Sequence, residues 1–169
     1  MRYLTESLEI RPFLESDREA AIDLFTDPLV KKTYMLPDFA SRDDAGKLFE
    51  RMMELSNTPG RNVAAISLDG NCIGMVNETG KNADIIEVGY AILPGFHGFG
   101  YATEMLRGCV LHLFGQGFRE VIAAAFEENP ASIRVMIKSG MTQMDLTEQI
   151  EYRGAIHRCV YYHIIKEEK

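Results

Sequence analysis

A glycine-rich stretch, PGFHGFGYATE, has the composition of a loop that lets a ligand approach the backbone. Its glycines, Gly95, Gly98 and Gly100, lie within six positions, and a helical pattern starts at Tyr101. The first amide groups of a helix have no intrahelical partner and lie at the positive end of the helix dipole, so they bind phosphate groups. We therefore expect an anion at this turn. A tight strand-to-helix connection without a ligand stays open as the alternative.

Two familiar phosphate-binding patterns do not fit this loop. The dinucleotide fingerprint is G-x-G-x-x-G with an acidic residue after the second strand, whereas here the order is G-x-x-G-x-G and the run VIAAAF precedes any acid. A P-loop needs Gly-Lys followed by Ser or Thr, and neither Gly46-Lys47 nor Gly80-Lys81 meets that requirement. The four histidines lack the spacing of metal ligands, so we expect no metal site.

Hydrophobic periodicity predicts the elements that position the loop. Strands are expected at 8–13, in two runs joined at Asp69-Gly70, at 84–93, 121–126, 142–152 and 157–165. Helices are expected after a capping box of Ser16 and Glu19, from Ser41 to Leu55, from Tyr101 to Gly117, and from Asn129 to Gly140. The segment 27–41 is predicted to be irregular; its large apolar residues either line a pocket or pack on the core.

The loop joins two of these strands through one helix. Such a crossover is right-handed and makes strands 84–93 and 121–126 parallel. The full order is strand, two helices, three strands, helix, strand, helix and two strands. It predicts an α/β (α+β) fold, with a mixed sheet of about seven strands and helices on both faces.

Length and charge exclude several classes of protein. The 169 residues have the size of one domain, with 46% hydrophobic and 25% charged residues. A net charge of −7 argues against a nucleic-acid partner; it would suit a cationic partner, or serve solubility alone. There is no apolar run of about 18 residues and no C-x-x-C spacing among the three cysteines. The first residues, MRYLTESLEIRPF, alternate like a strand and lack the unbroken apolar core of a signal peptide, so we do not expect export. We expect one domain over 1–169, cytoplasmic, with no membrane partner.

Three spaced motifs in this context resemble the GNAT superfamily of acetyl-CoA-dependent N-acetyltransferases. They are E-x-G-Y at 87–90, G-x-G-Y-A-T-E at 98–104, and N-x-x-S-x-x-x-x-x-K-x-G from Asn129 to Gly140. The similarity is greatest to the subgroup that acetylates N-terminal alanine or serine of ribosomal proteins, and it covers nearly the whole chain. The resemblance implies a mostly antiparallel central sheet with one parallel βαβ unit at the cofactor site.

The resemblance also implies which residues hold acetyl-CoA, the co-substrate. The diphosphate would lie on the turn formed by Gly98, Phe99, Gly100, Tyr101, Ala102 and Thr103. The pantetheine arm would lie between the strand end at Ile92 and Leu93 and the motif residues Asn129 and Ser132. His97 either contacts a phosphate or is solvated. One departure is Gly95, where many relatives have Gln or Arg, so binding would depend more on backbone groups.

Two side chains are candidates for the chemistry of acetyl transfer. Glu87 alternates with Ile86 and Val88 and would border an opening beside the small residues Gly89 and Ala91, where it could act as a base; the alternative is a solvated or Lys-paired carboxylate. Many superfamily members have a tyrosine that acts as the general acid at the position where this chain has Met136. The resemblance therefore favours Ser132 near the leaving sulfur, with a local helical role as the alternative.

The acceptor is expected to be a primary amine, most of all a protein or peptide N-terminus. In this superfamily the acceptor site is shaped by segments that correspond to 27–41 and 148–155, which suggests Tyr34, Met35, Glu87 and Tyr152 as acceptor-binding residues. A small amine such as a polyamine or an antibiotic, and a non-catalytic acyl-CoA-binding module, are the alternatives. Assembly into a homodimer stays open.

Overall fold

Strands and helices follow one another nearly as predicted in the computed structural model, which describes residues 1–167. The strands are β1 (Tyr3–Leu4), β2 (Leu8–Arg11), β3 (Val63–Leu68), β4 (Asn71–Lys81), β5 (Ile85–Ile92), β6 (Glu120–Phe126), β7 (Thr142–Tyr152) and β8 (Ala155–Ile165). The helices are α1 (Arg18–Thr26), α2 (Pro28–Thr33), α3 (Arg42–Ser56), α4 (Tyr101–Gly115) and α5 (Pro130–Lys138), with 3-10 turns η1 (Glu15–Asp17) and η2 (Pro94–Phe96).

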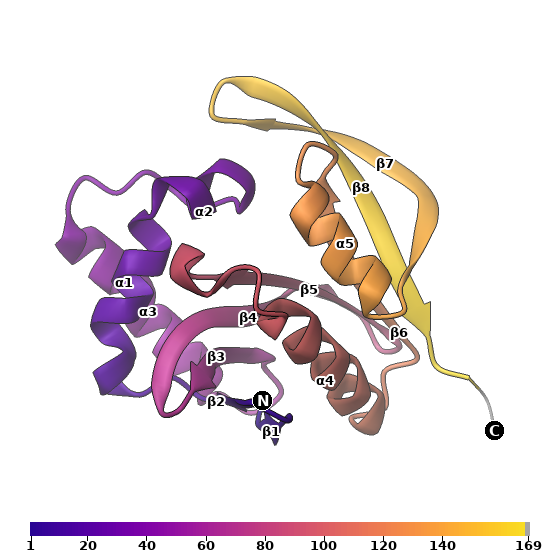
Figure 1. Ribbon diagram of the computed structural model, residues 1–169, viewed down its shortest axis with the longest axis horizontal. Helices are drawn as coiled ribbons and strands as arrows, with labels where there is room; N and C mark the ends of the chain where they lie inside the picture. Colours follow the sequence, from indigo (N-terminus) through magenta and orange to yellow (C-terminus); the bar gives the residue numbers. More distant parts are fainter. Residues whose placement is uncertain (168–169) are drawn as a thin grey trace.

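All the strands named above join one sheet in the order β1-β2-β3-β4-β5-β6-β8-β7 (Figure 1). Every neighbouring pair is antiparallel except β5 and β6, which are parallel and are linked through α4. The predicted mixed, mostly antiparallel sheet with one parallel unit is confirmed. The sheet has eight strands instead of about seven, because Tyr3 and Leu4 pair with β2.

Helices cover both faces of the sheet, as alternation along the strands requires (Figure 1). On one face α4 and α5 pack over Ile86 and Val88 in the largest apolar cluster. On the other face α1 and α3 pack over Ala65 and Met75. A third cluster around Phe126, Cys159 and Tyr161 lies on β6 and β8. Among residues 1–167, no helix combines the length and hydropathy needed to span a bilayer.

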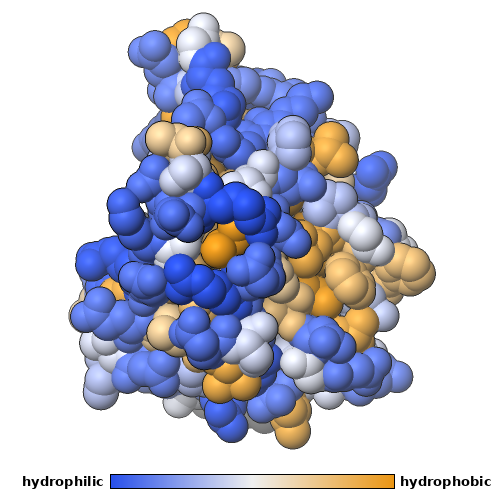
Figure 2. Space-filling view, turned by 90° about the vertical axis from the view of Figure 1, so that its left-hand side faces the viewer, coloured by the Kyte–Doolittle hydropathy of each residue, from blue (hydrophilic) through white to orange (hydrophobic). Residues whose placement is uncertain are grey.

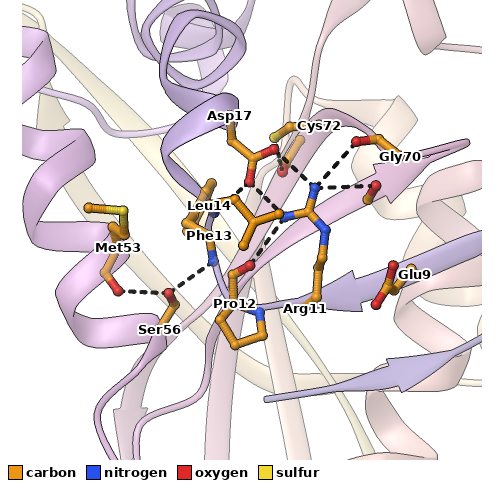
Figure 3. A network of polar contacts seen from close by, with 12 residues as sticks. Glu9, Arg11, Pro12, Phe13, Leu14, Asp17, Met53, Ser56, Gly70 and Cys72 are labelled. Carbon is orange, nitrogen blue, oxygen red and sulfur yellow. Dashed lines mark hydrogen bonds and ion pairs between the residues drawn. The ribbon is translucent and has the colours of Figure 1, made fainter.

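A buried ion pair joins β2 to the start of α1 (Figure 3). The Arg11 guanidinium donates to both carboxylate oxygens of Asp17 at 2.6 and 3.0 Å, and both side chains are at most 5% exposed. Asp17 also accepts from the Leu14 N–H at 2.8 Å. The predicted capping box is therefore wrong. The N-cap residue of α1, which begins at Arg18, is Asp17 rather than Ser16, and the Asp17 carboxylate binds Arg11 of β2 instead of capping the helix.

A short helix occupies Pro28–Thr33, the first part of the segment 27–41 that was predicted to be irregular, whereas 34–41 has no helix or strand, as predicted. The Asp27 carboxylate accepts from the N–H groups of Leu29 and Val30 at 2.8 and 3.0 Å, and Pro28 occupies the first turn of α2. Asp27-Pro28 therefore both ends α1 and starts α2, since Pro at a first turn has a suitable φ and needs no N–H partner.

The outer surface of α1 and α3 is mostly hydrophilic (Figure 2). Ion pairs there link the two helices: Arg42 contacts Glu19 and Asp23, both at 2.9 Å, and Arg18 contacts Glu50 at 3.2 Å. Exposed pairs of this kind contribute about 0.2–1 kcal/mol each. The apolar faces of α1 and α3, rather than these pairs, hold the layer in place.

Candidate active site

The glycine loop adopts a backbone conformation that requires glycine at only some of its positions. Gly98 and Gly100 have φ values of 85° and 92°, in the left-handed region that favours glycine. Nothing lies within 4 Å of a Cβ built on either residue, so their space is open rather than crowded. Gly95 has neither a positive φ nor a close neighbour. The conformation of two glycines, not close packing, explains this loop.

The N–H groups of Phe96 and His97 donate to the carbonyls of Leu93 and Pro94, whereas the amides from 98 to 103 that follow them lack a protein acceptor among the described residues. Gly100 is the N-cap of α4 without a side-chain cap, and the first helical bond runs from the Glu104 N–H to the Gly100 carbonyl at 3.0 Å. Within residues 1–167, none of the N–H groups from 98 to 103 donates to another protein group. A helix of fifteen residues adds its dipole to these donors. The turn has the properties of an anion site.

The acidic residue of the G-x-G-Y-A-T-E motif turns away from this turn. Glu104 accepts from the Thr5 hydroxyl at 2.5 Å and from the Ser7 N–H at 2.6 Å. Burial alone would raise the pKa of the Glu104 carboxyl, but these hydrogen bonds outweigh burial and lower it. Glu104 therefore fastens the first turn of α4 to the chain between β1 and β2, and leaves the amides of the turn without a nearby carboxylate partner.

Strands β5 and β6 separate beside the loop. Their pairing runs from Ile85 with Glu120 to Val88 with Ala123 and stops there among the described residues. Farther along β5, the Leu93 N–H donates to the Ile73 carbonyl of β4 at 2.8 Å. Since backbone groups alternate along a strand, the peptide groups of Tyr90 and Ile92 face the opposite way, into the gap between β5 and β6.

His97 forms a hydrogen bond with one of these peptide groups. Its Nε2 lies 2.7 Å from the Ile92 carbonyl oxygen, and because a carbonyl only accepts, Nε2 carries the proton. Neither of the two predicted settings of His97, at a phosphate or in solvent, describes this bond. The imidazole closes the loop back onto the end of β5.

The start of α5 forms the facing wall of the gap. Asn129 is the N-cap, and its side-chain oxygen accepts from the Ser132 N–H at 3.2 Å. The Ser132 hydroxyl lies 3.0 Å from the hydroxyl of Tyr90, which reaches across from β5. Burial raises the pKa of Tyr90 to about 12 in spite of this contact. Ser132 therefore has both a local role in the helix and a side chain directed to the gap.

These elements enclose a pocket of about 450 Å³. Predicted site residues that line it are Ile92, His97, Gly98, Gly100, Tyr101, Ala102, Thr103, Asn129, Ser132 and Tyr34. Others lie outside its lining: the Leu93 side chain packs with the cluster under α1 and α3, and Phe99 is 70% exposed and stacks on Tyr101 with ring centroids 5.9 Å apart. Met35, Glu87 and Tyr152 also lie outside it.

Sequence reasoning missed one wall of the pocket. Ala131, Arg134, Val135 and Lys138 line it from α5 at positions i, i+3, i+4 and i+7. This helical spacing was a usable signal, since such positions share one face. Neither the Arg134 nor the Lys138 side chain has an ion-pair or hydrogen-bond partner in the part of the chain that the structure describes. Two positive charges therefore face the pocket in a protein that is acidic overall.

Glu87 lies on the opposite face of β5 from Tyr90. It accepts from the Thr79 hydroxyl at 2.9 Å. The opening predicted beside it is filled: a Cβ on Gly89 would lie 3.0 Å from the Tyr34 hydroxyl oxygen and 3.2 Å from Cγ2 of Thr79. Gly89 is small because the Tyr34 ring packs there, with its hydroxyl bonded to Asn77. Glu87 is thus held at the edge of a packed aromatic ring.

A second carboxylate shares this face of the sheet. Glu148 on β7 accepts from the Tyr161 hydroxyl at 2.8 Å. Burial raises the pKa of Tyr161, and Glu148 and Glu87 raise it further; burial and the same two carboxylates also raise the pKa of the Cys159 thiol. The four groups therefore act on one another electrostatically. This face is suited to a cationic or amine ligand.

The tip of the β7–β8 hairpin is fastened to α2 and to the segment that follows it. The Tyr152 hydroxyl donates to the Lys31 carbonyl at 2.7 Å and accepts from the Leu36 N–H at 3.3 Å. Asp38 contacts both Lys31 and Arg153 at 2.7 Å, and these hydrogen bonds lower the pKa of its carboxyl. The two segments predicted to shape the acceptor site therefore do meet, with Tyr152 serving as a tether between them.

Comparison with known proteins identifies the family. The model of the acetyltransferase (GNAT) domain matches residues 7–142. A spore coat polysaccharide biosynthesis protein, SpsD of Bacillus subtilis, is 29% identical over an alignment of 160 residues that covers 92% of this chain and 50% of that protein. This chain thus spans half the length of that curated relative.

Solved structures agree in fold. A GNAT-family acetyltransferase from Bacillus anthracis superposes with a TM-score of 0.85 at 25% identity, over 99% of this chain and all of the other. RimL, a ribosomal L7/L12 alpha-N-protein acetyltransferase in complex with coenzyme A, superposes with a TM-score of 0.85 at 20% identity over 96% of both chains. With a family model that covers most of its length, this chain belongs to the GNAT acetyltransferase family.

Proposed function

We propose that this chain transfers the acetyl group of acetyl-CoA to a primary amine by direct attack on the thioester. The observation that carries the proposal is the gap between β5 and β6, which opens directly beside the unpaired amides at the start of α4. A ligand with a diphosphate at one end and a long amide-containing arm matches that combination of donors.

The residues around the pocket suit acetyl-CoA. Amides from 98 to 103 would hold the diphosphate, and Arg134 and Lys138 supply positive charge nearby. The Tyr90 peptide groups and the Ile92 N–H that face the gap would bind the amides of the arm, opposite Asn129, while the Ile92 carbonyl accepts from His97. A backbone N–H near Ile92 would meet the oxyanion of the reacting carbonyl.

Deprotonation of the amine separates the acceptor classes. A lysine with a pKa near 10.4 is neutral in roughly one of 2,500 molecules at pH 7, whereas an α-amine near 7.7–8.0 is neutral in about one of six to eleven. An N-terminal amine therefore needs only a weak base. Glu87 is the candidate base, and Glu148 is a second carboxylate on the same face that could take this role.

Ser132 is the candidate donor to the leaving sulfur. Its hydroxyl lies in the gap, and Met136, at the position where many superfamily members have a tyrosine, is fully buried and has no proton to donate. A thiolate with a pKa near 8.5 is a fair leaving group, so a neutral hydroxyl suffices.

We infer that the acceptor is a protein or peptide N-terminus. The motif resemblance to the ribosomal-protein subgroup and the shared fold with RimL support this acceptor, and the acidic face around Glu87 and Glu148 suits an amine. A small amine is the second candidate, because the curated relative SpsD belongs by name to polysaccharide biosynthesis.

A thiol-release assay with a panel of amines tests the proposal. Peptides with free and blocked N-termini, spermidine and an amino sugar are each supplied with acetyl-CoA. We expect turnover with the free peptide and none with the blocked one. Glu87→Gln should lower kcat about 100-fold, while Glu9→Gln, at a partly exposed strand position on β2, should leave it unchanged.

Each result has a distinct meaning. Turnover of spermidine or the amino sugar but of no peptide would refute the N-terminal acceptor and leave the transferase. Binding of coenzyme A in calorimetry without thiol release for any amine would refute catalysis and favour the acyl-CoA-binding module.

A further inference from the structure

The Tyr90 and Ser132 hydroxyls form a contact across the gap between β5 and α5. Their oxygen atoms lie 3.0 Å apart, and the Tyr90 oxygen is 3.4 Å from the Ser132 carbonyl oxygen. Both residues line the pocket. The aromatic ring of Tyr90 is partly buried and packs against the core under α4 and α5. The phenol is thus held in place, whereas the serine hydroxyl is free to rotate.

The direction of this hydrogen bond decides where the serine proton points. A hydroxyl has one proton to donate, and its oxygen accepts through its lone pairs. If Tyr90 donates to Ser132 Oγ, the serine proton must point elsewhere, and the pocket is the open side. If Ser132 donates to Tyr90, the serine proton is used within the pair, and only the Tyr90 proton is left for a ligand.

Geometry favours Tyr90 as the donor. The only other acceptor within reach of its proton among residues 1–167 is the Ser132 carbonyl oxygen, and at 3.4 Å that contact is longer than good O–H···O bonds, which cluster near 2.7–2.8 Å. Its burial also keeps the phenol protonated at neutral pH. A fixed, permanently protonated phenol next to a rotatable hydroxyl sets the orientation of that hydroxyl.

We propose that Tyr90 is a positioning residue that donates to Ser132 and so directs the Ser132 proton toward the sulfur of bound coenzyme A. This inference rests on the proposed function of the pocket. A side chain of β5 would thus orient the hydroxyl near the sulfur, in a chain that has Met136 on α5 where many superfamily members have a tyrosine.

The transfer step balances without a proton from Tyr90. The C–N bond forms, the C–S bond breaks, and the nitrogen releases one proton to a carboxylate or water. The departing thiolate accepts a hydrogen bond from Ser132 and takes its proton from water. Tyr90 and Ser132 stay neutral throughout, which agrees with a phenol whose pKa lies far above that of a thiol.

A double-mutant cycle on the full chain tests the coupling. Tyr90→Phe should lower kcat about tenfold and change KM for acetyl-CoA less than twofold; tenfold corresponds to about 1.4 kcal/mol, the size of one hydrogen bond. Ser132→Ala should lower kcat at least as much. The double variant should match Ser132→Ala alone, because Tyr90 acts only through Ser132.

Titration of the thiol of bound coenzyme A provides a readout that needs no acceptor. Thiolate absorbance in the ultraviolet reports its pKa. We expect the pKa of the bound thiol to rise by about one unit in Tyr90→Phe and in Ser132→Ala, and no further in the double variant. Tyr3→Phe, which removes a 3.0 Å hydrogen bond to the Met105 carbonyl, is the matched control and should leave both readouts unchanged.

The outcomes separate this inference from the proposed function. Absence of turnover with the expected thiol shifts would refute the transferase and support the Tyr90 role. Additive losses in the double variant, a loss confined to KM, or thiol pKa values unchanged by Tyr90→Phe would overturn the Tyr90 role even if the enzyme acetylates amines. Failure to bind coenzyme A would overturn both.

Discussion

The carboxylate of Glu104 accepts a 2.5 Å hydrogen bond from the hydroxyl of Thr5, a residue 99 positions earlier in the chain. This contact, with the 2.6 Å bond from the Ser7 N–H, joins the start of α4 to the N-terminal strands. The first turn of α4 also supplies the amides proposed to bind the diphosphate. Stability of the N-terminal strands and affinity for the co-substrate are therefore connected through one side chain.

Glu104→Gln should destabilise the fold by about 1–2 kcal/mol, because two hydrogen bonds to a charged acceptor become bonds to a neutral one. Chemical denaturation measures this change. Glu54→Gln, at an exposed position of α3, is the control and should cost less than about 0.5 kcal/mol. An equal loss in both variants would contradict the role of Glu104.

The Glu104 carboxylate makes the free energy of unfolding depend on pH in the acidic range. Its folded-state pKa lies below the ordinary value of 4.5, so the stabilisation is fully present above that value and is lost as pH falls through the folded-state pKa. The difference in unfolding free energy between wild type and Glu104→Gln should therefore be largest near pH 6–7 and should shrink below about pH 4.5. A difference that grows in acid would refute this sign.

Breaking the buried Arg11–Asp17 pair should be far more costly. Asp17→Asn leaves the guanidinium buried without its charge partner, and such changes cost about 3–5 kcal/mol. Asp23→Asn removes an exposed carboxylate that contacts Arg42 at 2.9 Å and should cost less than about 1 kcal/mol. Thermal or urea unfolding of the two variants compares them directly, and similar losses would show that the buried pair is not essential.

The positive wall of α5 should set the affinity for acetyl-CoA. Arg134→Ala and Lys138→Ala each remove a charge that lines the pocket, and KM for acetyl-CoA should rise about threefold to tenfold with kcat little changed. Added salt should reduce the difference in KM for acetyl-CoA between each variant and the wild type, because it screens the lost charge. Arg51→Ala on α3, far from the pocket, is the control. A salt-independent change would argue for lost packing instead of lost charge.

Tyr152→Phe should act on the acceptor rather than on acetyl-CoA. The change removes the hydrogen bonds that tether the β7–β8 hairpin to Lys31 and Leu36, worth about 1 kcal/mol. We expect a higher KM for the amine and an unchanged KM for acetyl-CoA in steady-state kinetics. Tyr162→Phe, which loses only a 3.4 Å contact with Gln143, is the matched control.

Local patterns predicted much of this fold. Alternation along β5 correctly separated Ile86 and Val88 from Glu87, since the first two face α4 and the last faces the other side. The glycine loop located the parallel unit because a crossover connection has one hand. These features depend on neighbours in the chain, which a sequence displays directly.

Other features arose from contacts that are distant in sequence. The space over Gly89 was expected to be open, but it is filled by Tyr34, which directly follows α2 and lies more than fifty positions earlier in the chain. The short α2 was missed because Pro28 is compatible both with ending one helix and with starting another. The side chains of Arg134 and Lys138 were absent from the predicted site although their helical spacing was visible.

The interruption of the ladder between β5 and β6 has a thermodynamic consequence. Past Val88 the sheet lacks the cross-strand hydrogen bonds that would hold its two halves together, so an extended ligand lying there would serve as a surrogate strand. By mass action such a ligand raises the free energy of unfolding, by about 2.7 kcal/mol at a concentration a hundredfold above Kd, and the melting temperature rises with its concentration. The resistance of this protein to heat would then report how much coenzyme A surrounds it.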